Sequence, residues 1–107
     1  MIDIVLYKTA TGKEPFLDWL KTIDNSFRKR IVKRLNQIIE TGNFGDHKSL
    51  GEGIFELRFD FGSGYRIYFG FEQHQIIILF CGGDKKTQTK DIKKAQEYWE
   101  DYNEKEY

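Results

Sequence analysis

The fold of this chain can be inferred from one segment, ELRFDFGSGYRIYF, residues 56–69. Apolar and polar side chains alternate on both sides of a Gly-Ser-Gly turn, a pattern typical of two half-buried strands joined as a hairpin. Because side chains alternate between the faces of a strand, the apolar residues of both strands reach one core only if Arg58 and Arg66 lie on the same face. A register with a three-residue turn, residues 61–63, then places the two arginines opposite each other. A slip by one residue would bury both arginines, so the sequence specifies this register.

Two arginines side by side need an explanation, because like charges directly opposite each other destabilise a sheet. One explanation is that Glu56 and Asp60, on the same face, neutralise them as exposed ion pairs. The other is that the two guanidinium groups form a binding site for an anion such as phosphate. Sheet physics alone favours the ion pairs. Tyr68 shares this face, where it could stack on a base or donate a proton.

The segments before the hairpin predict one strand and two helices. Residues 2–8 alternate and are rich in β-forming residues, as expected for a first strand. Pro15 suits the first turn of a short helix, and a longer helix follows that ends at Gly42. Three adjacent residues could cap the longer helix: Asp24, Asn25 and Ser26. Residues 43–53 have the composition of a loop.

The rest of the chain predicts three strands, at residues 54–61, 65–71 and 75–81, and a C-terminal helix. The last strand is almost wholly apolar, as expected for a strand covered on both faces. The helix is indicated by an apolar stripe: Ile92, Ala95, Trp99 and Tyr102. We therefore predict one α+β domain over residues 1–107, with the order β-α-α-β-β-β-α and a helix pair on one face of a twisted sheet.

Composition excludes several classes of protein. No apolar run approaches the length of a membrane span, and the N-terminus lacks a signal-peptide pattern. The single cysteine, Cys81, excludes a disulfide framework and fits a reducing cytoplasm; inside an apolar strand, we expect it to be a buried packing residue. No set of Cys, His and carboxylate residues has the spacing of metal ligands, so we predict neither a metal nor another cofactor.

Charge is unevenly spread although the net charge is zero. Residues 1–95 carry 16 Lys and Arg against 12 Asp and Glu, whereas residues 96–107 carry 1 against 5. The densest basic run is RKRIVKR, residues 28–34, which includes Arg28, Arg30 and Arg34. This run is either a solvated helix face or an anion-binding surface.

A second basic cluster, GGDKKTQ, follows the apolar strand directly. It places Lys85, Lys86 and Gln88 where the strand turns into a helix start, and helix N-termini favour anions. The spacing is not that of a P-loop, and a surface turn with solvated lysines is the alternative. If the strand before this turn pairs with the strand of Arg66, the lysines could approach the arginine face.

Residues 48–69 (KSLGEGIFELRFDFGSGYRIYF) and 78–99 (ILFCGGDKKTQTKDIKKAQEYW) together resemble the RelE/ParE toxin superfamily. The similarity is greatest to the HigB-like "addiction module killer protein" branch of bacterial toxin–antitoxin systems. The shared motifs are Glu-Leu-Arg at 56–58, Gly-x-Gly-Tyr-Arg-x-Tyr-Phe at 62–69 and Gly-Gly-Asp-Lys-x-x-Gln-x-x-Asp-Ile at 82–92. The chain departs from the branch at Ser63, where proline is usual, and in its neutral charge.

The resemblance implies a RelE-like fold with two helices against a twisted antiparallel sheet. It also implies a ribosome-dependent mRNA endonuclease that a cognate antitoxin, with a HigA-like helix-turn-helix domain, holds inactive. By position in the motifs, Arg58, Arg66 and Lys85 match the cations around the scissile phosphate, and Lys86 and Lys48 are their neighbours. The basic run could contact ribosomal RNA or the antitoxin, and Gln88 is grouped with the RNA-binding residues.

Metal-free RNA cleavage also needs a group that accepts the proton of the ribose 2′-OH. The sequence offers five candidates for this general base: His47, His74, Tyr65, Tyr68 and Glu56. Two other functions remain open on the residues. A ParE-like toxin binds and inhibits DNA gyrase without enzymatic activity, and a degenerate toxin would retain only its antitoxin binding.

Overall fold

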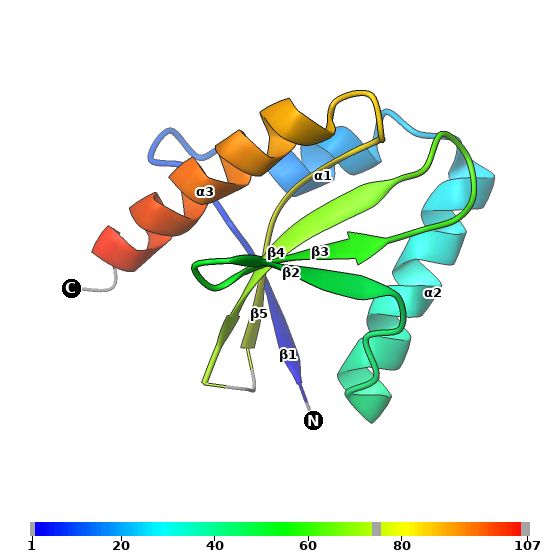
Figure 1. Ribbon diagram of the computed structural model, residues 1–107, viewed down its shortest axis with the longest axis horizontal. Helices are drawn as coiled ribbons and strands as arrows, with labels where there is room; N and C mark the ends of the chain where they lie inside the picture. Colours follow the sequence, from blue (N-terminus) through cyan, green and yellow to red (C-terminus); the bar gives the residue numbers. More distant parts are fainter. Residues whose placement is uncertain (1, 74–75, 106–107) are drawn as a thin grey trace.

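Residues 2–73 and 76–105, the part of the chain that the computed structural model describes, form three helices and five strands (Figure 1). The elements in chain order are β1 (Asp3–Leu6), α1 (Pro15–Leu20), α2 (Asn25–Thr41), β2 (His47–Gly51), β3 (Ile54–Arg58), β4 (Arg66–Glu72), β5 (Ile76–Gly83) and α3 (Gln88–Lys105). None of the helices in these residues is long and apolar enough to cross a bilayer.

The strands form one sheet in the order β1-β5-β4-β3-β2. Neighbouring strands from β2 to β5 are antiparallel, but β1 runs parallel to β5. The α+β class is thus confirmed, whereas the expectation of a wholly antiparallel sheet is wrong at one edge. A parallel neighbour needs a long crossover connection, and α1 to β4 lie between β1 and β5 along the chain.

The hairpin pairs in the predicted register. Arg58 lies opposite Arg66 and Leu57 lies opposite Ile67. Beyond the ladder, the backbone N–H of Phe59 donates to the carbonyl of Tyr65 at 3.0 Å, so the pairing continues toward the turn. The alternation of apolar residues and the short turn together predicted this geometry, because a slip by one residue would reverse the two faces of the hairpin.

Strand β2 corrects the predicted element order, because its residues were assigned to a loop. Two of the residue types in HKSLG, lysine and glycine, are depleted in strands, and the segment shows no alternation that would indicate one. The strand forms at the sheet edge through pairing with β3, where Lys48 lies opposite Glu56. Just before β2, the carbonyl of Asp46 accepts a hydrogen bond from the N–H of Arg58.

The helix boundaries follow the predicted signals. Helix α1 begins at Pro15, and α2 is capped by Asp24, whose Oδ2 accepts a hydrogen bond from the N–H of Ser26 at 3.2 Å. Helix α2 ends before Gly42. Local sequence sets these boundaries, because each depends on a single capping or helix-breaking residue.

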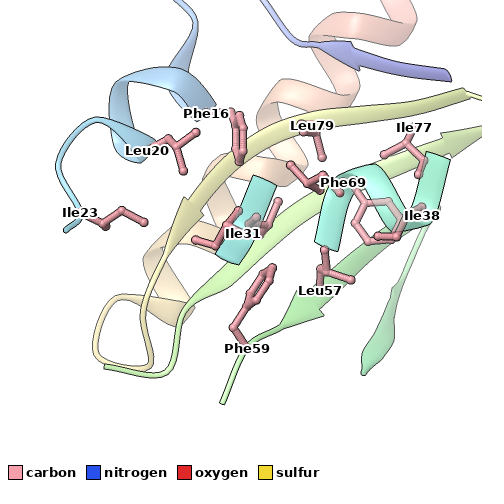
Figure 2. Packing of buried hydrophobic residues seen from close by; sticks show 12 residues of the cluster. Phe16, Leu20, Ile23, Ile31, Ile38, Leu57, Phe59, Phe69, Ile77 and Leu79 are labelled. Carbon is pink, nitrogen blue, oxygen red and sulfur yellow. The ribbon is translucent and has the colours of Figure 1, made fainter. Parts of the chain in front are cut away.

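The sheet separates two apolar layers. Helices α1 and α2 cover one face, and α3 covers the other. Figure 2 shows Leu57, Phe69 and Leu79 of the sheet gathered with Phe16 of α1 and Ile31 of α2. Strand β5 is buried on both faces, as predicted, since Ile78 and Phe80 belong to the layer beneath α3.

A β-bulge in β5 reverses the faces of the residues that follow it. Tyr68 lies opposite Cys81 but Phe69 lies opposite Leu79, so Phe80 is an extra residue in the ladder. As a result Gly82 pairs with Ile67 and faces the α1–α2 layer, while Gly83 pairs with Arg66 on the α3 side.

We predict that Gly82→Ala destabilises the protein by about 1–3 kcal/mol, because overpacking forces side chains or backbone to shift. A Cβ at this position would lie 2.3 Å from Cε3 of Trp19. Chemical denaturation of the variant measures the effect. Asn36→Ala, on the exposed face of α2, serves as the neutral control. Another glycine such as Gly12 is unsuitable, because its positive φ would itself strain an alanine.

Candidate anion-binding site

The arginine pair borders an open hollow of about 440 Å³. Strands β3 and β4 contribute one arginine each, and the hairpin turn and the turn after β5 supply other parts of the wall. The charged and hydroxyl side chains around it are those of Asp46, Arg58, Asp60, Ser63, Arg66 and Lys85. The structure therefore brings together the three cations that were assigned to one cluster from the sequence.

Lys85 reaches this hollow because the turn after β5 is fastened to the hairpin turn. The hydroxyl of Ser63 donates to Oδ2 of Asp84 at 3.2 Å. Gly64, at a φ of 78°, leaves space for the stem of Lys85, since a Cβ there would lie 3.1 Å from its Cγ. Ser63, the residue that departs from the resembled branch, thus contributes a contact that proline could not make.

Asp84 also organises the turn internally. Its Oδ1 accepts hydrogen bonds from the backbone N–H groups of Lys86 at 2.9 Å and Thr87 at 3.2 Å. Desolvation disfavours the charged carboxylate, but the hydrogen bonds from Thr87, Ser63 and Lys86 outweigh it and lower the pKa of Asp84. The carboxylate is therefore ionised at neutral pH and holds the turn in place.

Glu56 lies behind the arginines and is fully buried. Its Oε1 is 2.7 Å from Nε of Arg66 and 3.4 Å from Nε of Arg58, although the Arg66 N–H does not point at the oxygen as in a hydrogen bond. The expected exposed ion pairs are therefore wrong: the neutralising carboxylate is internal. Asp60 forms no ion pair with either arginine in the described part of the chain.

Tyr68 lies beneath α3, with none of its surface exposed. Burial, followed by the charge of Glu56, raises the pKa of its hydroxyl above the usual range. A ring in this position cannot stack on a ligand at the surface, which is the reverse of the exposed position expected from the hairpin. Cys81 is buried as predicted, and desolvation raises the pKa of its thiol to about 12.

The other candidate bases do not converge on the hollow. His47 pairs with Leu57 and therefore faces the α2 side of the sheet, where its Nδ1 lies 2.9 Å from the carbonyl oxygen of Gly45. Tyr65 packs in the core layer beneath the helix pair. His74 lies outside the described residues. Glu56 is enclosed by the arginines.

Two carboxylates that were not considered as bases, Asp46 and Asp60, line the hollow and are exposed. Asp60 could be placed on the arginine face from the strand alternation. Asp46 could not, because its position depends on the pairing of β2 with β3, which the local sequence does not indicate.

The cations of α2 divide into internal and exposed groups. Arg34 donates to the carbonyls of Arg58, Phe44 (2.8 Å) and Asp46 (2.7 Å), and its guanidinium lies over the ring of Phe59. Desolvation lowers its pKa. This contact set joins α2 to the segment before β2, so the predicted RNA-binding role gives way to a structural one.

The remaining predicted RNA contacts lie in different settings. Arg28 donates to the carbonyl of Ile23 at 3.2 Å, near the start of α2, whereas Arg30 is exposed above the ring of Phe61 at 3.9 Å. Lys48 and Lys86 are exposed. Gln88 points inward and donates to both carboxylate oxygens of Glu56 at 3.1 Å.

Metal ligation finds no support in the described residues, which contain no group of three or more His, Cys, Asp or Glu side chains suited to hold an ion. The available chemistry is that of guanidinium and ammonium groups facing an open hollow with carboxylates at its rim. Such an arrangement can bind a phosphate group and stabilise added negative charge on it.

Comparison with known proteins shows what the chain is similar to. Residues 18–100 match the family described as "Phage derived protein Gp49-like (DUF891)". An uncharacterized protein of Haemophilus influenzae is 47% identical over 81 residues, which cover 76% of this chain and 82% of that protein. A chain of the intact E. coli RelBE toxin–antitoxin complex has a similar fold, with a TM-score of 0.56 and 16% identity over 78% of this chain and 94% of that chain.

Proposed function

We propose that this chain, which belongs to the Gp49-like phage-derived family, is the toxin of a toxin–antitoxin system. The family match covers most of the chain, and the fold is that of RelE, whose complex with its antitoxin is the structural relative. The motifs of residues 56–58, 62–69 and 82–92 support placing the chain in the HigB-like branch.

We further propose that the toxin is a ribosome-dependent mRNA endonuclease. The observation that carries this proposal is the convergence of Arg58, Arg66 and Lys85 on one open hollow. One buried carboxylate faces the two arginines from inside, while Arg58 and Lys85 line the open side of the hollow, where a phosphodiester could pair with them. A toxin that only binds another protein has no need of such a phosphate site.

The reaction requires no metal. The ribose 2′-OH attacks the adjacent phosphorus, and its proton passes to a base. The P–O5′ bond breaks, which leaves a 2′,3′-cyclic phosphate, and the departing 5′-oxygen takes a proton from water. Arg58 and Lys85 would stabilise the negative charge that builds on the phosphate oxygens. Asp46 and Asp60, the carboxylates at the rim, are the best-placed side chains to accept the proton.

The exposed cations of α2 would contact the RNA backbone beyond the hollow. Arg30 and Lys33 line a neighbouring depression that shares Phe59 and Asp60 with the arginine site. Contacts between cations and phosphates release counterions, so binding to the ribosome should weaken steeply with salt. The proposed protein partner is a cognate antitoxin with a HigA-like helix-turn-helix domain, and the proposed site of action is the cytoplasm.

The test is to translate a defined message with purified ribosomes in the presence of the protein and to map the ends by primer extension. We expect new 5′ ends within the coding region, and only when ribosomes are present. Intact message would contradict the endonuclease proposal. A DNA gyrase supercoiling assay run beside it would identify the ParE-like alternative, since that toxin acts on gyrase and leaves the message whole.

A further inference from the structure

The buried carboxylate of Glu56 has a role that anion binding alone does not explain. A carboxylate removed from water is strongly destabilising unless it is paired and hydrogen-bonded. Glu56 meets this need with Arg66, Arg58 and the side-chain amide of Gln88. We propose that Glu56 is a positioning residue, which fixes Arg66 against the sheet and leaves Arg58 and Lys85 to contact the phosphate.

The sheet places this carboxylate between the two guanidinium groups. Glu56 and Arg58 are two residues apart on β3 and share a face. Arg66 lies opposite Arg58, which makes it the diagonal neighbour of Glu56 across the strand pair. The carboxylate therefore offsets the repulsion of the arginines from inside the protein, and their outer side stays open to a ligand.

The two arginines are not equivalent in their surroundings. The side chain of Arg66 is 11% exposed and that of Arg58 is 33% exposed. Arg66 also donates through Nη1 to the carbonyls of Gly64 and Tyr65, both at 3.2 Å, so three internal contacts define its position. Arg58 has one long contact with Glu56, and its side chain lines the hollow.

Gln88 extends this arrangement to α3. It is the first residue of the helix, and its amide nitrogen lies 3.1 Å from each oxygen of Glu56. An amide that donates to both oxygens holds the carboxylate in one orientation and adds no charge. The structure thus gives Gln88 a positioning role, in place of the RNA contact expected from its position in the motif.

The kinetic consequence rests on the proposed endonuclease function. Glu56→Gln keeps the size of the side chain and removes its charge. We expect the rate of cleavage at saturating ribosomes to fall about tenfold or more. Arg66 would lose its interaction with the charged Glu56 carboxylate, and an interaction with a charged group is large enough to account for that factor. Affinity for single-stranded RNA should stay the same or increase, because the hollow becomes more positive.

A merely structural role would behave differently, since a damaged fold weakens binding and cleavage together. Glu40→Gln, on the exposed side of α2, makes the same chemical change away from the site and should leave both unchanged. Gln88→Ala removes a contact of Glu56 without changing the charge of the protein, and it should also slow cleavage. This variant replaces Glu56→Gln in the test if Glu56→Gln does not fold. Cleavage at the wild-type rate in the folded variants, or a parallel loss of RNA affinity, would overturn the inference.

The structural consequence can be tested on the protein alone, by NMR of the arginine Nε–H groups. In the wild type we expect the Arg66 signal to exchange with water more slowly than the Arg58 signal, because Nε of Arg66 is buried and lies 2.7 Å from the Glu56 carboxylate. In Glu56→Gln, where the charged partner is lost, the Arg66 signal should exchange faster. Inorganic phosphate should shift the Arg58 signal more than that of Arg66. Equal exchange in wild type and variant would refute the positioning role, even if the wild-type protein proves not to cleave RNA.

Discussion

The double variant Arg58→Ala/Lys85→Ala should abolish growth arrest on expression in a bacterial host and slow message cleavage by about 10²- to 10³-fold. Both side chains line the hollow. Without them, the buried carboxylate of Glu56 still has Arg66 and Gln88 as partners. Loss of the charges of Arg58 and Lys85 removes the stabilisation of the phosphate in the transition state. Single-turnover cleavage on ribosomes measures the effect.

A matched control removes two positive charges elsewhere. Lys13 and Lys21 are exposed residues outside the hollow, near α1. Lys13→Ala/Lys21→Ala should retain growth arrest and cleavage within about twofold, since surface charges away from special contacts have small effects. Full activity in the Arg58/Lys85 variant would show that this hollow is not the reaction site.

Arg66→Ala is a less direct test of the same site. Its guanidinium is nearest to the buried Glu56 carboxylate, and removing one partner of a buried ion pair leaves an uncompensated charge. The loss of activity in that variant could therefore follow from a loss of folded protein. Arg58 and Lys85 avoid this problem because they lie nearer to the solvent.

Arg34→Met should lower the free energy of unfolding by about 2–4 kcal/mol, although it keeps the aliphatic stem of the side chain. Three backbone carbonyls, those of Arg58, Phe44 and Asp46, would lose a charged donor together. These carbonyls belong to the segment before β2 and to the end of β3, so the edge strand should loosen first. Thermal unfolding should show a fall in Tm of roughly 10 °C or more.

Lys33→Met is the matched control, because Lys33 precedes Arg34 on α2 and is exposed. Its Tm should match that of the wild type, whereas its affinity for ribosomes should fall if α2 contacts RNA. A wild-type Tm for Arg34→Met would contradict the structural role of Arg34. Together the two variants separate the internal and exposed cations of one basic run that the sequence presents as uniform.

The hairpin and the helix boundaries could be predicted because each depends on neighbours in the chain. The alternation of residues 54–71 places Arg58 and Arg66 on one face, and the short turn between the strands sets them opposite each other. The helix signals are equally local: the backbone conformations of Pro15 and Gly42 start and end a helix, and Asp24 caps one by accepting a hydrogen bond from a nearby N–H group. Local chemistry is sufficient in both cases.

The candidate site was less accessible to such reasoning. Its three cations were identified from hairpin geometry and motif positions, but the burial of Glu56 and Tyr68 was not. The same polar face of the hairpin is open at Arg58 and covered by α3 at Tyr68. Whether a polar residue faces water or a packed helix depends on where that helix lies, and alternation carries no information on this.

Local pattern in this protein establishes the α+β class, the arginine pair, the start of α1 and both limits of α2. Long-range pairing establishes β2, which exists because β3 offers it a partner and Arg34 holds the segment before it. The bulge at Phe80 also depends on long-range pairing. The apolar residues of β5 can face either side of the sheet, so the pairing with β4 determines the register. The pairing with β4 turns Gly83 toward Arg66 and brings Lys85 to the hollow. The position of Lys85 therefore depends on how β5 pairs in the sheet, and the sequence of β5 alone does not determine it.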